Sequence, residues 1–366
     1  ISLGLAALMV ISACGGGSGG DKTNDSGRPS TNLDQASTLN GTLPDDGPPQ
    51  YGGILRTNQA SEPPSLDPHK SPSFAVPTAT AGTVYNKLVE FESNRDIPYG
   101  TMKVRPDLAE SYEQAKDGMT WTFKLRKGVK FQNLAPVNGR EFVSSDVVCT
   151  LDRIKSVPGP QLYLLDPVAS YATPDPYTVV FTMKFPYPAF DESLASFYMS
   201  MMPCEAARGE FDPNVTPIGT GPFIMTERKL NVETDYVKNP DYFVKGQPYV
   251  DGLKTVVMPD ANAALAAMRT GQLDVTGSIN QTILQSMIST NPEIVVRDQL
   301  TLGPNQIMFN LDKKPFDDYR VRKAIAMGFD REGMAKTFYD KYWLYTGPIP
   351  SMLFGGMDTE EAAKAI

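Results

Sequence analysis

The chain of 366 residues is 41% hydrophobic, which suffices for the cores of two or three folded domains. Lys and Arg number 34 against 42 Asp and Glu, and the resulting net charge of −8 argues against a protein that binds the phosphates of nucleic acids. The single histidine excludes zinc sites built from several imidazoles and leaves a serine or cysteine nucleophile only one histidine to use as its base.

The first 13 residues form an uncharged apolar run, and Cys14 follows the sequence Ile11-Ser12-Ala13. The run is shorter than the roughly 20 residues of a membrane-spanning helix and is typical of the apolar part of a secretory signal. Its end resembles the lipobox of bacterial lipoproteins, with Ile11 where leucine is commoner and with no initiator Met or basic segment before it. The resemblance implies that Cys14 is diacylated on its sulfur and becomes the mature N-terminus. An uncleaved anchor and a mispredicted start are the alternatives.

Residues 15–50 contain eight glycines, many Ser, Thr, Asn and Asp residues, and no aromatic residue. Such a composition cannot offset the entropy cost of folding, so we expect a flexible tether. As a flexible coil it would reach about 30 Å, which lets a folded domain move at a membrane surface while two acyl chains on Cys14 hold it there.

The folded part is predicted to begin with a short strand at 51–56, followed by a proline-rich loop up to residue 77 that contains His69. Prolines at 63, 64, 68 and 72 surround this histidine. We therefore expect His69 to be solvated or packed in a turn rather than catalytic.

The middle of the chain has clear periodicity. Residues 119–125 alternate strictly, which predicts a strand after the turn signal Asp117-Gly118. A helix is predicted to be capped at 144–146, and a turn at 175–176 leads into a strand at 177–183. The buried stripe of the helix is expected to consist of Val147, Leu151 and Ile154.

After Pro259 the pattern changes to alternating helices and strands, which is typical of a largely parallel α/β lobe. The predicted elements are a helix at 263–268, a strand at 273–275, a helix at 283–288, strands at 294–296 and 305–311, and a helix from 317 onward.

Patterns for nucleotide chemistry and hydrolysis are weak. No Walker motif is present, and Gly219-Thr220-Gly221-Pro222 has proline where a phosphate-binding loop needs a free N–H. The acidic pairs Glu360-Glu361 and Asp45-Asp46 could suggest a hydrolase, but adjacent acids on a tail or tether are usually solvated.

Six stretches, taken together and in this order, resemble the family 5 extracellular solute-binding proteins of ABC transporters, which include oligopeptide, dipeptide and nickel binders. They are Pro64-Ser65-Leu66-Asp67-Pro68-His69, residues 105–112, residues 121–131, Pro217-Ile218-Gly219-Thr220-Gly221-Pro222-Phe223, residues 238–243 and residues 309–325.

The resemblance implies an α/β, two-lobed periplasmic-binding-protein-like fold of type II, with a subdomain inserted in the first lobe and a second lobe that is incomplete in this chain. The domains expected are the signal and lipobox at 1–14, the Gly/Ser-rich linker at 15–50, the first lobe at 51–82 and 205–258, the inserted subdomain at 83–204 and the beginning of the second lobe at 259–366.

The same resemblance implies a substrate-binding lipoprotein of an ABC importer, not an enzyme. It would capture short peptides or similar polar solutes between its lobes and deliver them to permease subunits, as a monomer held to the outer face of the cytoplasmic membrane through Cys14. No cofactor, metal or nucleic acid is expected. Ser73, Phe74 and Ala75 are the ligand-binding candidates, against the alternative of a solvated loop with one aromatic residue in the core.

Two points stay open. A sensor or chaperone lipoprotein without a transport role would have the same lobes. Cys149 stands where relatives usually carry a bulky aromatic residue, and an oxidising compartment would permit a bridge to Cys204, although two unpaired thiols are the default expectation.

Overall fold

The computed structural model describes residues 47–93, 102–277, 287–294 and 307–339, except residues 72, 74, 158, 160, 288 and 292. The chain divides into two compact units, the first within 45–92 and 103–279 and the second containing residues 280–366. In chain order the elements are β1 (Ile54–Gln59), η1 (Pro77–Ala81), β2 (Val89–Phe91), β3 (Val104–Pro106), β4 (Ala109–Gln114), β5 (Thr120–Leu125), α2 (Ser144–Ser156), η2 (Leu162–Leu165), β6 (Val168–Asp175), β7 (Thr178–Met183), α3 (Phe190–Ala195), η3 (Phe197–Met199), α4 (Cys204–Ala207), β8 (Phe223–Lys229), β9 (Glu233–Lys238), β10 (Gly252–Val257), α5 (Ala261–Arg269), α7 (Tyr319–Gly328) and α8 (Arg331–Tyr339).

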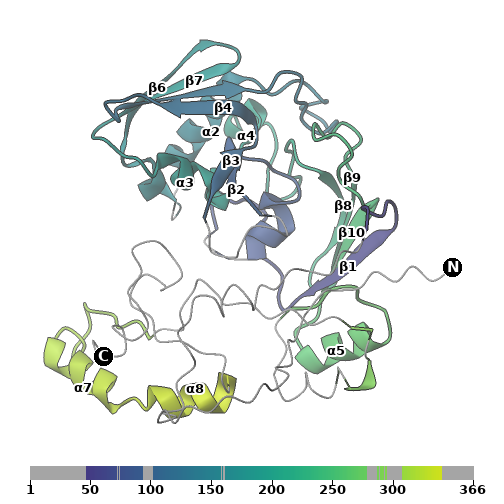
Figure 1. Cartoon of the computed structure of the whole chain (residues 1–366), viewed down its shortest axis with the longest axis vertical. Coiled ribbons are helices and arrows are strands. Elements are labelled where there is room, and N and C mark those ends of the chain that lie inside the picture. Colours follow the sequence, from purple (N-terminus) through teal and green to yellow (C-terminus); the bar gives the residue numbers. More distant parts are fainter. Residues whose placement is uncertain are drawn as a thin grey trace, which may run out of the picture. The chain divides into compact units, whose positions relative to one another are not determined.

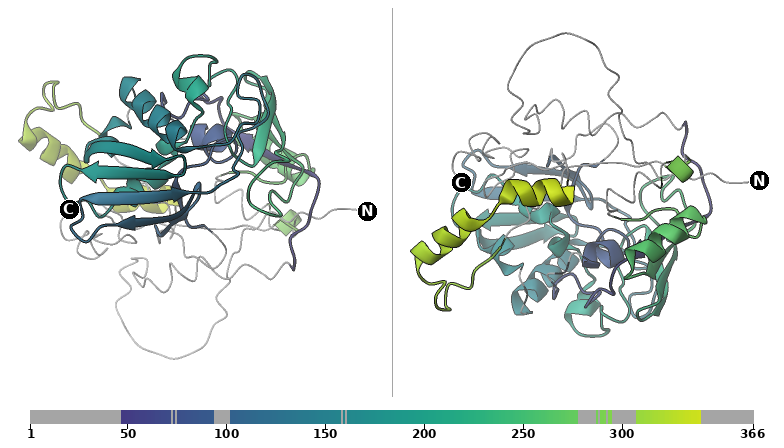
Figure 2. Two further views of the ribbon diagram at one scale, coloured as in Figure 1. Left: turned by 90° about the horizontal axis from the view of Figure 1, so that it is seen from above. Right: turned by 90° about the horizontal axis from the view of Figure 1, so that it is seen from below.

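The larger core of the first unit is built on an antiparallel sheet of order β4-β5-β7-β6, whose strands lie side by side in Figures 1 and 2. Trp121, Phe123 and Leu125 are buried on one face of β5, as their alternation predicts. Phe181 of β7 packs edge-on against Phe123 with 5.6 Å between the ring centroids. The predicted turn before β5 is confirmed, because Gly118 adopts φ 71°, a conformation that favours glycine.

Helix α2 packs on this sheet through the predicted stripe, since Val147, Leu151 and Ile154 are all buried in the same core. Its first turn is closed by Asp146, whose carboxylate accepts the Val143 N–H at 3.1 Å. Ser144 does not cap the helix, because its hydroxyl donates to the Asp175 carbonyl at 2.8 Å. The helix is therefore tied at its start to the turn between β6 and β7.

The smaller core lies against a mixed sheet of order β1-β10-β9-β8. β1 runs parallel to β10, with Ile54 opposite Gly252, while β9 is antiparallel to both β10 and β8. Tyr236 of β9 is buried against this core. The remaining members are Val84, Tyr85, Met202, Ala206 and Phe223.

The two cores meet at a glycine-containing segment that the sequence singled out. The Gly221 N–H donates to the Val84 carbonyl at 2.8 Å, and the Gly219 carbonyl accepts the Gln132 N–H at 2.9 Å. A Cβ on either glycine would strike the Val84 backbone. The two glycines of this loop thus serve close backbone packing, where the chain passes from Ile218 in the larger core to Phe223 in the smaller one.

The predicted lobe boundary at Pro259 disagrees with the contacts of residues 261–277. Asp274 accepts hydrogen bonds from the Arg56 guanidinium at 2.7 and 3.0 Å, and Val275 forms a parallel bridge with Thr57. These residues therefore belong with β1 in the first unit, which also contains α5. Local periodicity changes at Pro259, but periodicity does not reveal which strand a segment joins.

In the second unit, α7 begins where the sequence predicts, since the Asp318 carboxylate accepts the Arg320 N–H at 2.8 Å. The predicted strand at 305–311 is wrong for its described part, because residues 307–311 form no strand. The predicted elements at 283–288 and 294–296 lie almost entirely outside the described residues. Within the described ranges, no helix has both the length and the apolar character needed to cross a membrane.

Candidate functional site

The candidate segment follows β1 and leads into η1. Ser73 and Ala75 are half-buried, whereas Phe74 and the lipidation candidate Cys14 lie outside the described residues. The Ser73 N–H donates to the Ser71 hydroxyl at 3.3 Å, the Ala75 N–H to the Ser73 hydroxyl at 3.3 Å, and the Val76 N–H to the Ser73 carbonyl at 3.1 Å. The two bonds to serine hydroxyls are slightly longer than usual for an N–H donor, whereas the bond from Val76 has an ordinary length.

A buried ion pair lies a few residues before this segment. The Arg153 guanidinium from α2 donates to both carboxylate oxygens of Asp67, at 2.5 and 3.2 Å. Asp67 is fully buried and Arg153 is 7% exposed. Burial by itself would raise the pKa of Asp67, but the hydrogen bond and charge of Arg153 lower it below its usual value. The pair is thus a charged clamp between α2 and the loop.

His69 completes this cluster. Its Nδ1 accepts from Arg153 at 2.7 Å, and its Nε2 donates to the Ser200 carbonyl at 2.9 Å. Burial, followed by the nearby Arg153 charge, lowers the pKa of His69 to about 4. Of the two expected alternatives, the turn-packing histidine is confirmed and the solvated one is wrong, because the ring is fully buried.

Further side chains hold the loop from other directions. Asn214 accepts the Leu66 N–H at 2.7 Å, Thr80 donates to the Leu66 carbonyl at 2.8 Å, and Gln161 donates to the His69 carbonyl. Asn214 and Gln161 lie far from the loop in the sequence, and Thr80 lies in η1, the element that follows the loop. The loop therefore has a fixed path up to the candidate segment.

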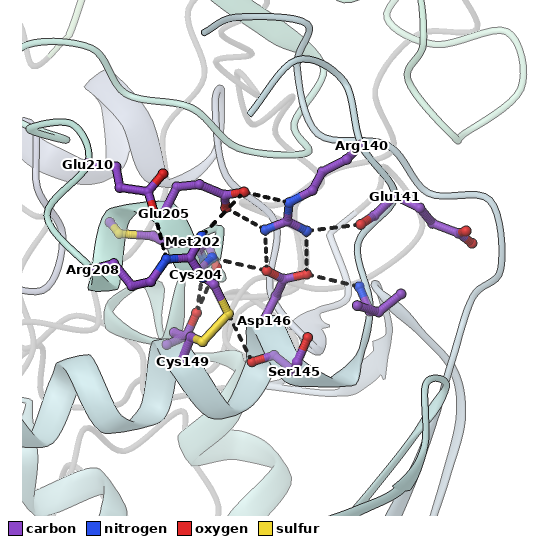
Figure 3. The surroundings of a disulfide bond; sticks show 12 residues. Arg140, Glu141, Ser145, Asp146, Cys149, Met202, Cys204, Glu205, Arg208 and Glu210 are labelled. Atoms are coloured by element: carbon purple, nitrogen blue, oxygen red, sulfur yellow. Dashed lines mark hydrogen bonds and ion pairs between the residues drawn. A yellow bond between two sulfur atoms is a disulfide. The ribbon is translucent and has the colours of Figure 1, made fainter. Parts of the chain in front are cut away.

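The expected unpaired state of the two later cysteines is wrong, because Cys149 and Cys204 form a disulfide with their Cα atoms 5.2 Å apart (Figure 3). The contact arises because α4 begins against α2. The Cys204 N–H donates to the Asp146 carboxylate at 3.0 Å, and the Met202 N–H donates to the Thr150 hydroxyl at 3.0 Å.

A charged cluster lies beside this disulfide. Figure 3 shows Arg140 between Glu205 and Asp146, with hydrogen bonds of 2.5 and 2.8 Å to Glu205 and of 2.6 and 2.9 Å to Asp146. The hydrogen bonds from Arg140 lower the pKa of Glu205, and the hydrogen bond to Glu205 raises that of Arg140. The cluster and the disulfide together hold α4 on α2.

The buried charged groups described above hold the loop against α2 and hold α4 on α2. His69 is engaged on both ring nitrogens and lies close to a guanidinium. In the part of the chain that the structure describes, no group of three or more His, Cys, Asp or Glu residues could hold a metal ion. The motif containing Asp67 and His69 pointed to this region, but the role of Arg153 had no signal in the sequence.

The comparisons with known proteins agree on one family. The family model described as bacterial extracellular solute-binding proteins, family 5 Middle, matches residues 103–365. Di/tripeptide-binding protein 2 of Pseudomonas aeruginosa is 31% identical over 332 residues, which are 83% of this chain and 61% of that protein. The chain thus spans about three fifths of the length of this curated relative.

Solved structures show the same likeness. An ABC transporter-associated periplasmic binding protein from Helicobacter pylori, in complex with the peptide STSA, matches with a TM-score of 0.72 at 23% identity, covering 86% of this chain and 65% of that one. The oligopeptide-binding protein AppA from Bacillus subtilis, in complex with a nonapeptide, matches with a TM-score of 0.69 at 25% identity, covering 83% and 59%. The expected two-lobed fold of periplasmic binding proteins, with mixed helix and sheet, is confirmed.

Proposed function

The chain belongs to the bacterial extracellular solute-binding proteins of family 5, and from this membership we propose that it captures short peptides for an ABC importer. The observation that carries the proposal is the family match over residues 103–365. The names of a di/tripeptide-binding relative and of two peptide-bound structures direct it toward peptides.

The proposed binding is reversible and involves no chemical change. An extended peptide offers N–H and C=O groups along its backbone, and such groups can pair with exposed protein backbone whatever side chains the peptide carries. Ser73, Phe74 and Ala75 are the proposed pairing residues. The described bonds of Ser73 and Ala75 support this role, because they are long enough to be exchanged.

Three further parts of the proposal concern the cell. Cys14 anchors the protein to the outer face of the cytoplasmic membrane through its acyl chains, and residues 15–50 act as the tether. The loaded protein, a monomer, delivers its peptide to permease subunits. The inserted subdomain comprises about residues 83–204, and the chain enters the second lobe after residue 277.

The test is to identify what the protein carries when it is purified without denaturation. Native mass spectrometry is expected to show added masses that fragment as short peptides, and calorimetry with a defined tripeptide and pentapeptide mixture is expected to give dissociation constants near the micromolar range, about −8 kcal/mol. Binding of a metal chelate or a sugar instead of peptides would leave a solute-binding role and overturn the peptide assignment. Turnover of the added peptide would overturn the proposal of binding without chemistry.

A further inference from the structure

Arg153 is the one residue of α2 that contacts both Asp67 and His69 among the described contacts of that helix. We propose that Arg153 is a positioning residue for peptide binding: through Asp67 and His69 it sets the path of the backbone that reaches Ser73 and Ala75. The inference deepens the proposed function and rests on it for the ligand, but the positioning itself can be measured without one.

First, one guanidinium, that of Arg153, binds two residues of the loop, Asp67 and His69. Arg153 holds both oxygens of Asp67 and the Nδ1 of His69, and the Asp67 carboxylate in turn accepts the His69 N–H at 3.0 Å. The Asp67 carbonyl also accepts the Lys70 N–H at 3.2 Å. Removing the guanidinium would leave the buried Asp67 carboxylate with the more distant Lys70 ammonium, at 3.8 Å, and without the two hydrogen bonds from Arg153. The loop would then be free to turn that carboxylate toward Lys70 and water.

The second step is the path from this cluster to the candidate segment. His69 is followed within two residues by the buried Ser71, whose hydroxyl accepts the Ser73 N–H. The Ser73 hydroxyl then accepts the Ala75 N–H. A displacement of His69 is therefore passed on through two serine turns, whose hydrogen bonds are each 3.3 Å long.

The third step is that α2, the helix that carries Arg153, has supports outside the loop. The helix is joined to residues 202–204 by the Cys149–Cys204 disulfide and by the Thr150 hydroxyl, which donates to the Met202 carbonyl at 3.1 Å and accepts the Met202 N–H at 3.0 Å. The stripe of α2 is buried in the larger core as well. Arg153 is thus presented to the loop from a rigid support.

The experiment compares Arg153→Met and Arg153→Lys with Thr150→Val. Thr150 is buried on the same helix and loses two hydrogen bonds on substitution, but it makes none of the described contacts with the loop. This control therefore reports the effect of losing two buried hydrogen bonds of α2 while every described contact between α2 and the loop is kept. Arg153→Lys keeps a positive charge near Asp67 but cannot bind Asp67 and His69 at the same time as the guanidinium does. It replaces Arg153→Met in the comparison if that variant does not fold.

Two readouts are taken on the whole protein. Hydrogen–deuterium exchange by mass spectrometry, without ligand, follows a proteolytic peptide that covers residues 65–76. Arg153→Met is expected to speed its exchange at least about tenfold more than Thr150→Val does, with Arg153→Lys in between. Calorimetry with the tripeptide and pentapeptide mixture is expected to show about tenfold weaker binding in Arg153→Met than in the control.

The outcomes separate the two proposals. Selective exchange means that residues 65–76 exchange faster in Arg153→Met than in Thr150→Val. If it is seen but the wild type binds no peptide, the positioning is supported and the proposed function is overturned. Equal exchange in Arg153→Met and Thr150→Val would overturn the positioning, even if the wild type binds peptides. Selective exchange with unchanged peptide affinity would overturn the link between this cluster and binding.

Discussion

Cys149 in α2 is bonded through its sulfur to Cys204, the first residue of α4, and the two Cα atoms are 5.2 Å apart. The bridge closes a loop between residues 55 apart in the chain, and this loop contains β6, β7 and α3. It therefore restricts the unfolded chain over a large part of the first unit.

The first prediction concerns this bridge. The double variant Cys149→Ser, Cys204→Ser is expected to lose about 2 to 4 kcal/mol in the free energy of unfolding, because its unfolded state regains loop entropy. It should still fold, since Arg140 and Thr150 hold the same two segments together. Urea unfolding measures the loss, and Cys14→Ser is the control. A double variant as stable as the control would contradict the prediction.

The second prediction compares the two acids that bind Arg140. Asp146→Asn is expected to cost about 3 kcal/mol, because the fully buried Asp146 also accepts the N–H groups of Val143 and Cys204. Glu205→Gln should cost less, about 1 to 2 kcal/mol, since the Glu205 side chain is 11% exposed whereas that of Asp146 is 0% exposed. Thermal and urea unfolding of both variants provide the comparison, and equal losses would show that burial does not separate the two roles.

The third prediction is a dependence on pH. The unfolded chain gains the histidine proton below about pH 6.5, whereas the folded protein keeps His69 neutral down to about pH 4. The unfolded state therefore binds more protons in this window, and the stability contributed by the neutral ring is lost as the pH falls from 6.5 to 4, by at most about 3 kcal/mol.

Because the chain contains one histidine, His69→Gln removes this contribution. The stability difference between wild type and variant is expected to shrink from pH 7.5 to pH 4.5, as measured by urea unfolding at several pH values. A difference that stays constant over this range would mean that His69 titrates in the folded protein as it does in the unfolded chain.

The fourth prediction tests the close packing at the junction of the two cores. Gly221→Ala is expected to destabilise the protein by about 3 kcal/mol or more, because its Cβ would lie 2.5 Å from the Val84 carbonyl carbon. Gly277→Ala is the matched control, since nothing lies within 4 Å of the equivalent Cβ there. Circular dichroism during thermal unfolding separates the two variants, and similar melting temperatures would refute the steric argument.

The fifth prediction concerns membrane attachment. Metabolic labelling with a fatty-acid analogue is expected to mark the wild type and to leave Cys14→Ser unmarked, because the sulfur of Cys14 is the proposed acylation site. The other two cysteines are joined to each other and serve as an internal control. Equal labelling of both proteins would remove Cys14 from the proposal.

Local pattern predicted which sides of β5 and α2 face the core. The alternation of Trp121, Phe123 and Leu125 and the stripe of Val147, Leu151 and Ile154 both face the core as expected, because each depends on the period of a single strand or helix. Edge strand β6 was missed, since it is mostly exposed and lacks such a pattern.

Long-range partners could not be predicted in this way. Thr57 pairs with Val275, and Arg153 reaches Asp67 across 86 residues, yet neither partner carries a local signal of the other. Prolines around His69 indicated a histidine that is solvated or packed in a turn, and they gave no sign that the guanidinium bonded to its buried ring comes from a distant helix. The disulfide between Cys149 and Cys204 could not be predicted either, because the sequence does not show that α4 packs against α2.

The parallel pairing of β1 with β10 sets an order of events during synthesis. Gly53 and Asp251, which are hydrogen-bonded beside this pair, are 198 residues apart. At about 5 to 20 residues per second, β1 waits roughly 10 to 40 s before its partner has been made. The antiparallel sheet draws all its strands from residues 109–183 and has its parts together much earlier. β1, the first of the described strands to be made, thus pairs late. Until then it remains an unpaired strand that other chains or chaperones can bind.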